Sequence, residues 1–227
     1  MKKIIQISSL ILLIVFVLFI SISNLISDNN IKKIDKLDLD DVNNIMIVAH
    51  PDDETLWGGD HLSKSNYLVV CVTCGVDKQR QEEFNNVVNE YGNVGLSLGF
   101  PDKTNGQKDN WSKHYYIIEK TLKKIINYKD WDMIVTHNPD GEYGHIHHQM
   151  ISTMVTKNAK KDNLYYFNKY YTKEELENIN NCKKELNEKE LKMKNHLLSY
   201  YSSQEAIINN HYQNVPLENF IPYKYWN

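Results

Sequence analysis

Residues 45–54 read Ile45-Met46-Ile47-Val48-Ala49-His50-Pro51-Asp52-Asp53-Glu54, five apolar residues followed by an imidazole, a proline and three carboxylates. A short apolar run that stops at such a turn predicts a buried β-strand. Three carboxylates so close to a buried strand are costly unless a cation neutralises them. The stretch therefore predicts a metal site at the end of a strand, and a metal beside a spare carboxylate is typical of hydrolases.

Apolar runs and helical patterns alternate along the rest of the chain. We expect strands over Ile45–Ala49, Tyr67–Thr73, Val94–Leu98, Met133–Thr136 and Leu164–Phe167, and helices over Thr55–Ser65, Gln79–Tyr91, Ser112–Tyr128 and Ile146–Asn158. Residues 174–208 predict one or two further surface helices. This alternation predicts an α/β fold with right-handed βαβ units and a mostly parallel sheet, covered by helices on both faces.

The first 42 residues do not follow this pattern. Lys2 and Lys3 precede eleven uninterrupted apolar residues, Leu10–Ile20, so residues 1–27 are interpreted as a signal peptide or a transmembrane anchor. Both interpretations stay open, and the weak cleavage site at residues 21–23 favours the anchor. Residues 28–42 are polar and predict a tether, followed by a single domain over residues 43–227. We expect a membrane-anchored or secreted protein whose domain lies outside the cytoplasm.

The composition excludes several classes of protein. A net charge of −3 at pH 7 leaves no overall basic field for binding nucleic acid. Three cysteines are too few for a disulfide framework. Cys71 and Cys74 are three apart in a predicted strand and would point to opposite faces, so we interpret them as small buried side chains rather than as a metal or redox pair.

A second polar cluster follows the fourth predicted strand. It spans residues 137–148 and contains His137, His145, His147 and His148. Ligands bind beyond the carboxyl ends of the strands in an open parallel sheet, so this cluster and residues 50–54 are expected to meet at one edge. His50, Asp53 and His148 could then supply the three protein ligands that a hydrolytic zinc site needs.

Several motifs together resemble one family of enzymes. Ala49-His50-Pro51-Asp52-Asp53-Glu54 followed by Gly144-His145-x-x-His148 resembles the LmbE/PIG-L family of zinc-dependent de-N-acetylases. Arg80-x-x-Glu83, Leu98-Gly99-Phe100-Pro101-Asp102 and Tyr201-x-Ser203-Gln204 are similar to later motifs of the family, in the same order. The resemblance covers most of residues 45–204 and implies a Rossmann-like α/β fold.

The resemblance also implies roles for individual residues. By it, Zn²⁺ is held by His50, Asp53 and His148. Asp52 is then the general base, and His145 stabilises the oxyanion. Arg80 and Asp102 bind the sugar. The family often carries Asp or Asn where this chain has His147, which affects how the site is tuned, and Glu54 is expected to support a neighbouring ligand.

Plainer roles remain open for some of these residues. Asp52 could cap the helix after it, Arg80 could be a surface cation, Asp102 could be a turn residue, and His137 could line the pocket or satisfy a carbonyl group. The function expected is hydrolysis of a linear amide C–N bond, the acetamide of an N-acetylglucosamine-type sugar or glycoconjugate. The alternatives are a zinc amidase for another acylated small molecule and a non-catalytic sugar- or nucleotide-binding module.

Overall fold

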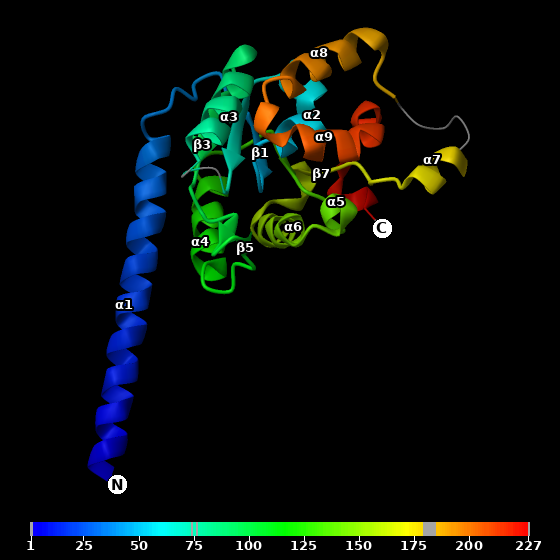
Figure 1. The fold of residues 1–227 in the computed structure, drawn as a ribbon. Coiled ribbons are helices and arrows are strands. Elements are labelled where there is room, and N and C mark those ends of the chain that lie inside the picture. Colours follow the sequence, from blue (N-terminus) through cyan, green and yellow to red (C-terminus); the bar gives the residue numbers. More distant parts are fainter. Residues whose placement is uncertain (1, 74, 76, 179–184, 227) are drawn as a thin grey trace.

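A six-stranded sheet forms the centre of the molecule, with the strand order β3-β2-β1-β6-β7-β8 (Figure 1). The computed structural model describes residues 2–73, 75, 77–178 and 185–226. Its strands are β1 (Asn44–Val48), β2 (Tyr67–Cys71), β3 (Val94–Ser97), β6 (Met133–Thr136), β7 (Leu164–Phe167) and β8 (Phe220–Pro222). All neighbouring strands pair in parallel except β7 and β8, which are antiparallel. The predicted α/β fold with a mostly parallel sheet is therefore confirmed.

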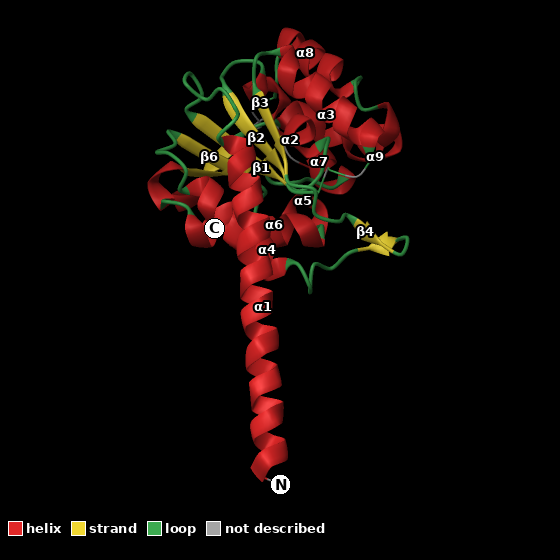
Figure 2. Cartoon of the chain, turned by 90° about the vertical axis from the view of Figure 1, so that its left-hand side faces the viewer, coloured by secondary structure: helices red, strands yellow, loops and turns green. Residues whose placement is uncertain are grey.

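Helices cover both faces of this sheet (Figure 2). One face carries α1 (Lys2–Ile34), α4 (Tyr115–Ile126) and α6 (Ile146–Asn158), and the other carries α2 (Asp53–Leu62), α3 (Lys78–Glu90), α8 (Glu188–Leu198) and α9 (Glu205–His211). Alternate residues of β1 face opposite layers, so Ile45 and Ile47 belong to the first core while Met46 and Val48 belong to the second. Burial on both faces explains why the strand is apolar throughout.

The N-terminal segment differs from the prediction in its second half. Residues 28–34 continue α1, and Ile34, Leu39 and Val42 are buried in the core. Lys129 also donates hydrogen bonds to the carbonyl groups of Leu39 and Val42. The polar segment over residues 28–42, interpreted from the sequence as a tether, is thus partly helical, and its scattered apolar side chains pack on the domain while its charges face outward.

Two small elements were not expected from the sequence. The hairpin of β4 (Lys103–Thr104) and β5 (Gln107–Lys108) turns at Asn105 and Gly106, whose φ angles are 53° and 77°. Such positive angles suit Asn-Gly in a two-residue hairpin, a signal that the sequence does carry. Strand β8 has only three residues and includes a proline, so no apolar run marks it.

The cysteine interpretation can be checked at one position. Cys71 is fully buried in β2. Cys74 and Cys182 lie outside the described residues.

Candidate functional site

The turn after β1 directs its carboxylates inward. The Asp53 carboxylate accepts a hydrogen bond from the His50 amide at 2.8 Å, and the Glu54 carboxylate accepts one from the Asp52 amide at 3.2 Å. Asp52 has a φ of 113°, a strained conformation for a residue with a side chain. This turn holds the side chains of His50, Asp52 and Asp53 at the carboxyl edge of the sheet, where α2 begins.

Three side chains that could bind a metal, those of His50, Asp53 and His148, form a small buried triangle at this edge. Nδ1 of His50 lies 3.2 Å from Asp53 Oδ2, and Nε2 of His148 lies 3.3 Å from Asp53 Oδ1 and 3.3 Å from His50 Nδ1. His148 is fully buried on the first turns of α6. The structure thus brings together the three residues expected from the sequence to bind a metal.

The second nitrogen of each histidine is already engaged. Nδ1 of His148 donates to Glu142 at 2.6 Å. Nε2 of His147 donates to the Asp109 carbonyl, so Nδ1 of His147 must accept, and it accepts from His50 Nε2 at 3.0 Å. In their neutral forms, His50 and His148 therefore direct the lone pairs of Nδ1 and Nε2, respectively, at the Asp53 carboxylate.

These donors fit a zinc ion. Three lone pairs that converge within one triangle need a cation between them, and N, N, O donor sets with an open position are typical of catalytic zinc. A carboxylate on the outer nitrogen of a ligating histidine, as Glu142 is on His148, is also typical. Although burial opposes it, the carboxylates of Asp102 and Asp53 raise the pKa of His50 to about 9, so without a metal the ring holds a second proton at neutral pH. That proton lies on Nδ1, beside Asp53, and a bound cation would replace it.

Glu142 is a residue whose importance the sequence did not suggest. It sits at φ 56° in the short helix α5 (Gly141–Gly144) and accepts from both His148 and His137. Despite its burial, the neighbouring His137 and the hydrogen bonds from both histidines lower the pKa of Glu142 to about 2. His137 is fully buried and its Nε2 accepts from the Ala49 amide, so it satisfies a backbone group and positions Glu142 rather than lining the pocket.

Asp52 is the spare carboxylate of the site. Its side chain makes no cap hydrogen bond to α2, which removes the support for a capping role. Burial and the neighbouring charge of Asp53 raise the pKa of Asp52 well above its ordinary value. It lines the same pocket as His50 and Asp53, so a carboxylate with raised proton affinity faces the space where a substrate would bind.

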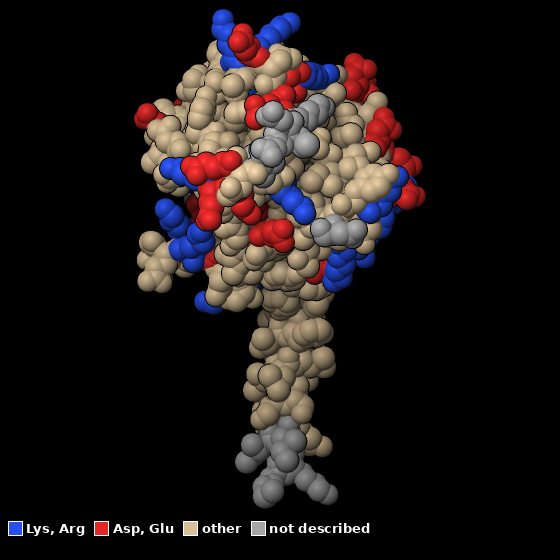
Figure 3. Space-filling model, turned by 90° about the vertical axis from the view of Figure 1, so that its right-hand side faces the viewer, with Lys and Arg blue, Asp and Glu red and all other residues tan. Residues whose placement is uncertain are grey.

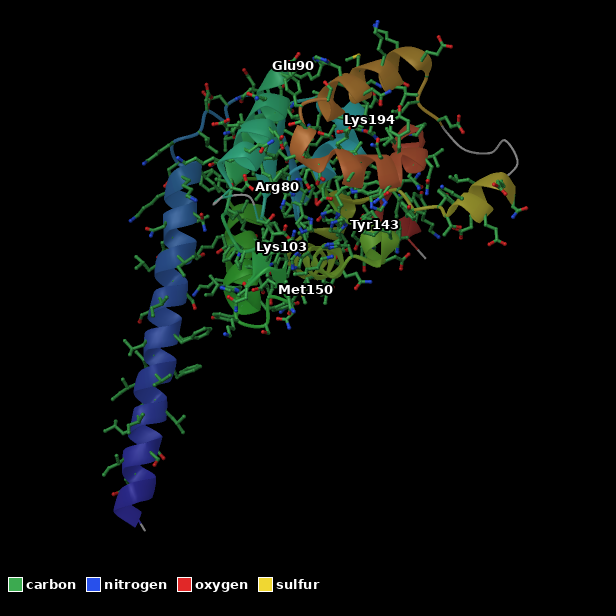
Figure 4. All side chains as sticks on the ribbon, viewed as in Figure 1. Arg80, Glu90, Lys103, Tyr143, Met150 and Lys194 are labelled. Carbon is green, nitrogen blue, oxygen red and sulfur yellow. The ribbon has the colours of Figure 1, made fainter. Side chains whose placement is uncertain are left out.

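A pocket of about 720 Å³ opens over the triangle. Its walls come from distant parts of the chain, and Figure 4 labels Arg80 on α3, Lys103 on β4 and Tyr143 on α5. Further wall residues are Asp102, Lys108, His145, Gln204, Ile207 and His211. The residues from α9 and the hairpin were not predicted, because nothing in their local sequence marks them as functional.

Arg80 and Asp102 form one unit at the rim. The guanidinium of Arg80 donates to Asp102 at 3.1 Å and to the Pro51 carbonyl at 3.3 Å. Asp102 also lies 3.5 Å from Nε2 of His50, and although burial opposes it, this histidine and Arg80 lower the pKa of Asp102. Neither residue therefore behaves as an isolated surface or turn residue.

The remaining predicted residues have distinct environments. His145 caps α6 by accepting the His147 amide on Nδ1, and its Nε2 lies 2.6 Å from Lys108 Nζ. Burial and the neighbouring His148 and His50 lower the pKa of His145 to about 2, so its ring is neutral. His147 stacks on Trp111 at 3.9 Å and supports His50 from outside the triangle.

Glu54 supports the turn rather than a ligand. Its carboxylate accepts from the Tyr201 hydroxyl at 2.6 Å, the Thr55 hydroxyl at 2.6 Å and the Asp52 amide. Glu83, the acidic residue of the Arg80-x-x-Glu83 motif, similarly accepts from the backbone and hydroxyl groups of Ser203. Both contacts hold the segment around residues 201–204 against the carboxyl edge of the sheet.

Comparison with known proteins gives two matches. A family model described as PIG-L: GlcNAc-PI de-N-acetylase matches residues 45–159, which is half of the chain and includes both polar clusters. An uncharacterized protein of Acanthamoeba polyphaga mimivirus is 27% identical over 219 residues, covering 89% of this chain and 86% of the viral protein. The first match confirms the resemblance seen in the sequence motifs.

Proposed function

The chain belongs to the PIG-L family of de-N-acetylases, and from this membership we propose that it is a zinc-dependent hydrolase that removes the N-acetyl group from an N-acetylglucosamine-type sugar or glycoconjugate. The observation that carries the proposal is the triangle of His50, Asp53 and His148 with the spare carboxylate of Asp52 beside it in an open pocket. A binding module would have no need of this spare base.

In the proposed reaction, Asp52 takes a proton from the attacking water. A zinc ion bound by the triangle would act as a Lewis acid and lower the pKa of water to about 7. The raised pKa of Asp52 makes it a stronger base than an ordinary aspartate. Once protonated, Asp52 can return the proton to the departing nitrogen, so that amide and water become acetate and amine.

His145 is proposed to stabilise the developing negative charge. Because its Nδ1 accepts the His147 amide, the proton of the neutral ring is on Nε2. Nε2 lies 2.6 Å from the Lys108 ammonium, and both groups line the pocket. An acceptor oxygen that approaches from the pocket, such as the carbonyl oxygen of the acetamide, could receive hydrogen bonds from both groups in place of their mutual contact, and donors placed in advance in this way accelerate acyl transfer.

Arg80 and Asp102 are proposed to bind the sugar. Both lie at the rim of the pocket, and their polar groups suit the hydroxyls of a pyranose ring. Their mutual pairing fixes both side chains before the substrate arrives, which reduces the entropy lost on binding.

Two measurements test the proposal. The purified full-length protein should contain about one zinc per chain, and it should release acetate from at least one member of a panel of N-acetylglucosamine conjugates and other N-acyl compounds. His148→Gln should lose both the metal and the activity, whereas His196→Gln, which changes an exposed histidine on α8, should keep both. Zinc-free protein that still releases acetate would refute the proposed site.

We also propose that α1 anchors the protein in a membrane. Residues 6–34 have a mean hydropathy of 2.8 over their most apolar window, and only 6% of that window is buried. Figure 3 shows the projecting part of this helix free of charged side chains among the described residues. An N-terminal tag that remains on the mature protein, and resistance of that protein to alkaline extraction, would support an anchor, whereas loss of the tag would indicate a cleaved signal.

A further inference from the structure

A second cavity lies on the surface of α4, away from the proposed active site. It has a volume of about 670 Å³ and shares no lining residue with the pocket over the metal triangle. Its walls are Tyr116, Glu119, Lys120, Lys123, Lys124, Asn127 and, from α6, Lys157. We call it the α4 groove.

The α4 groove carries excess positive charge. Lys124 pairs with Asp28 of α1, and Lys157 pairs with Glu119 at 2.5 Å. Lys123 has no acidic partner within ion-pair distance among the residues described. Four lysines therefore face two carboxylates, and an anion could bind without displacing either pair.

Contacts between α1 and α4 fix the height of the groove along the N-terminal helix. The ring of Phe19 contacts Tyr116, Asn24 contacts Lys120, and Asp28 contacts Lys124. Residue numbers rise together in these pairs, so the helices run parallel. The groove consequently extends from the level of Phe19 upward. Figures 1 and 2 show α1 and α4 side by side where α1 meets the domain.

This height corresponds to the headgroup layer if α1 spans a bilayer. A hydrocarbon core about 30 Å thick needs about 20 helical residues at about 1.5 Å each. Counted from Ile4, such a span ends near Ser23, one residue before the Asn24–Lys120 contact. Lys120, Lys123 and Lys124 then lie just outside the hydrocarbon. Tyr116, which is 46% exposed and level with Phe19, lies about 6 Å inside this boundary, with its hydroxyl close to the interface where tyrosine is favoured.

We propose that the α4 groove binds the phosphate of an anionic phospholipid headgroup and so holds the domain against the membrane surface. The proposal rests on α1 being a retained anchor, but not on the enzymatic activity. Lysines placed immediately outside a membrane span attract anionic lipids, and the groove supplies several of them together with the volume that a headgroup needs. A zwitterionic headgroup would gain less, because its own cation opposes the lysines.

Native mass spectrometry of the full-length protein tests the assignment. The protein, purified in non-ionic detergent, is mixed with equal amounts of phosphatidylserine and phosphatidylcholine, and the lipid retained per chain is counted. Preferential retention of phosphatidylserine is expected. Lys123→Gln combined with Lys157→Gln should reduce this retention about five-fold per lysine. Lys189→Gln combined with Lys192→Gln, the same charge change on exposed positions of α8, should leave it unchanged.

Three outcomes would overturn the proposal. Equal retention of both lipids would show that the groove does not select an anion. An equal loss in the α8 control would show that overall charge, rather than the groove, attracts the lipid. Competition by glycerophosphoserine as strong as that of the intact lipid would assign the groove to a soluble phosphate. The zinc content of each variant is measured in parallel, so that a failure here is separable from a failure of the proposed function.

Discussion

Nε2 of His50 donates a hydrogen bond to Nδ1 of His147 at 3.0 Å. Because His147 in turn donates from Nε2 to the Asp109 carbonyl, the direction of both bonds is fixed. The free lone pair of His50 is thereby directed at Asp53 and His148. His147, at a position where the resemblance led us to expect Asp or Asn, thus sets the tautomer of neutral His50 without being one of the three residues of the triangle.

Replacing His147 should weaken metal binding. In His147→Leu, the His50 ring loses the acceptor that keeps its proton on Nε2, so we expect zinc affinity to fall by about 10- to 100-fold. Competition with a fluorescent zinc chelator measures this affinity. His196→Leu, on the exposed face of α8, is the matched control. Unchanged affinity in His147→Leu would mean that the tautomer of His50 is set elsewhere.

Asp52→Asn should separate metal binding from catalysis. The amide keeps the shape of the carboxylate but cannot accept the proton of the water, so we expect kcat to fall by about 10²- to 10⁴-fold with the zinc content unchanged. Acetate release and elemental analysis on the same sample provide both values. An active Asp52→Asn enzyme would assign the base to another residue. Asp77→Asn, at the cap of α3 on the pocket wall, tests whether any nearby carboxylate has the same effect.

Arg80→Lys should raise KM more than it lowers kcat. The planar guanidinium bridges Asp102 and the Pro51 carbonyl, and an ammonium cannot reproduce this fork. Loss of a charged hydrogen bond of this kind corresponds to about a 10-fold or larger rise in KM for the sugar. Lys78→Gln removes an exposed charge from the same helix and should leave KM unchanged. A fall confined to kcat would place Arg80 in the chemical step.

Stability should fall in acid through Glu218. This carboxylate is buried, yet Lys194 and His61 lower its pKa to about 2 from an ordinary 4.5. A lowered pKa in the folded state stabilises the protein above pH 4.5, and that contribution, about 3 kcal/mol for Glu218 alone, is lost as the pH falls from 4.5 to 2. Burial also lowers the pKa of Lys194, so the pair contributes less than Glu218 alone would suggest.

Urea titrations at pH 3 and pH 6 measure this effect as a free energy of unfolding. The wild-type protein should lose more stability between the two pH values than Glu218→Gln combined with Lys194→Met, which removes both buried charges and cannot titrate there. The double variant is preferred to Glu218→Gln alone, because a single substitution would leave Lys194 buried without its partner. Equal losses in the two proteins would mean that other carboxylates control the acid limit.

The sequence predicted the parts of this structure that follow from local pattern. The apolar run before His50, and the alternation of apolar runs and helical patterns after it, were sufficient to predict the central strands. They also predicted the edge of the sheet where the polar residues gather. The role of Glu142 could not be predicted, because it depends on a positive φ and on two histidines that tertiary structure brings to one carboxylate. Lys108 and His211 were missed for a related reason, since only the folded chain places the hairpin and α9 on the pocket wall.

The packing of Ile34, Leu39 and Val42 changes what an anchor would do. A flexible linker between an anchor and the domain would let the proposed active site reach a wide range of distances from the bilayer. Here α1 is continuous to Ile34, which is buried in the core, so an anchoring α1 would hold the site at a fixed distance from the membrane. An enzyme held in this way would select its substrates partly by the distance of the acetamide from the membrane surface. It would act on an acetamide close to the surface but not on the same group at the end of a long glycan.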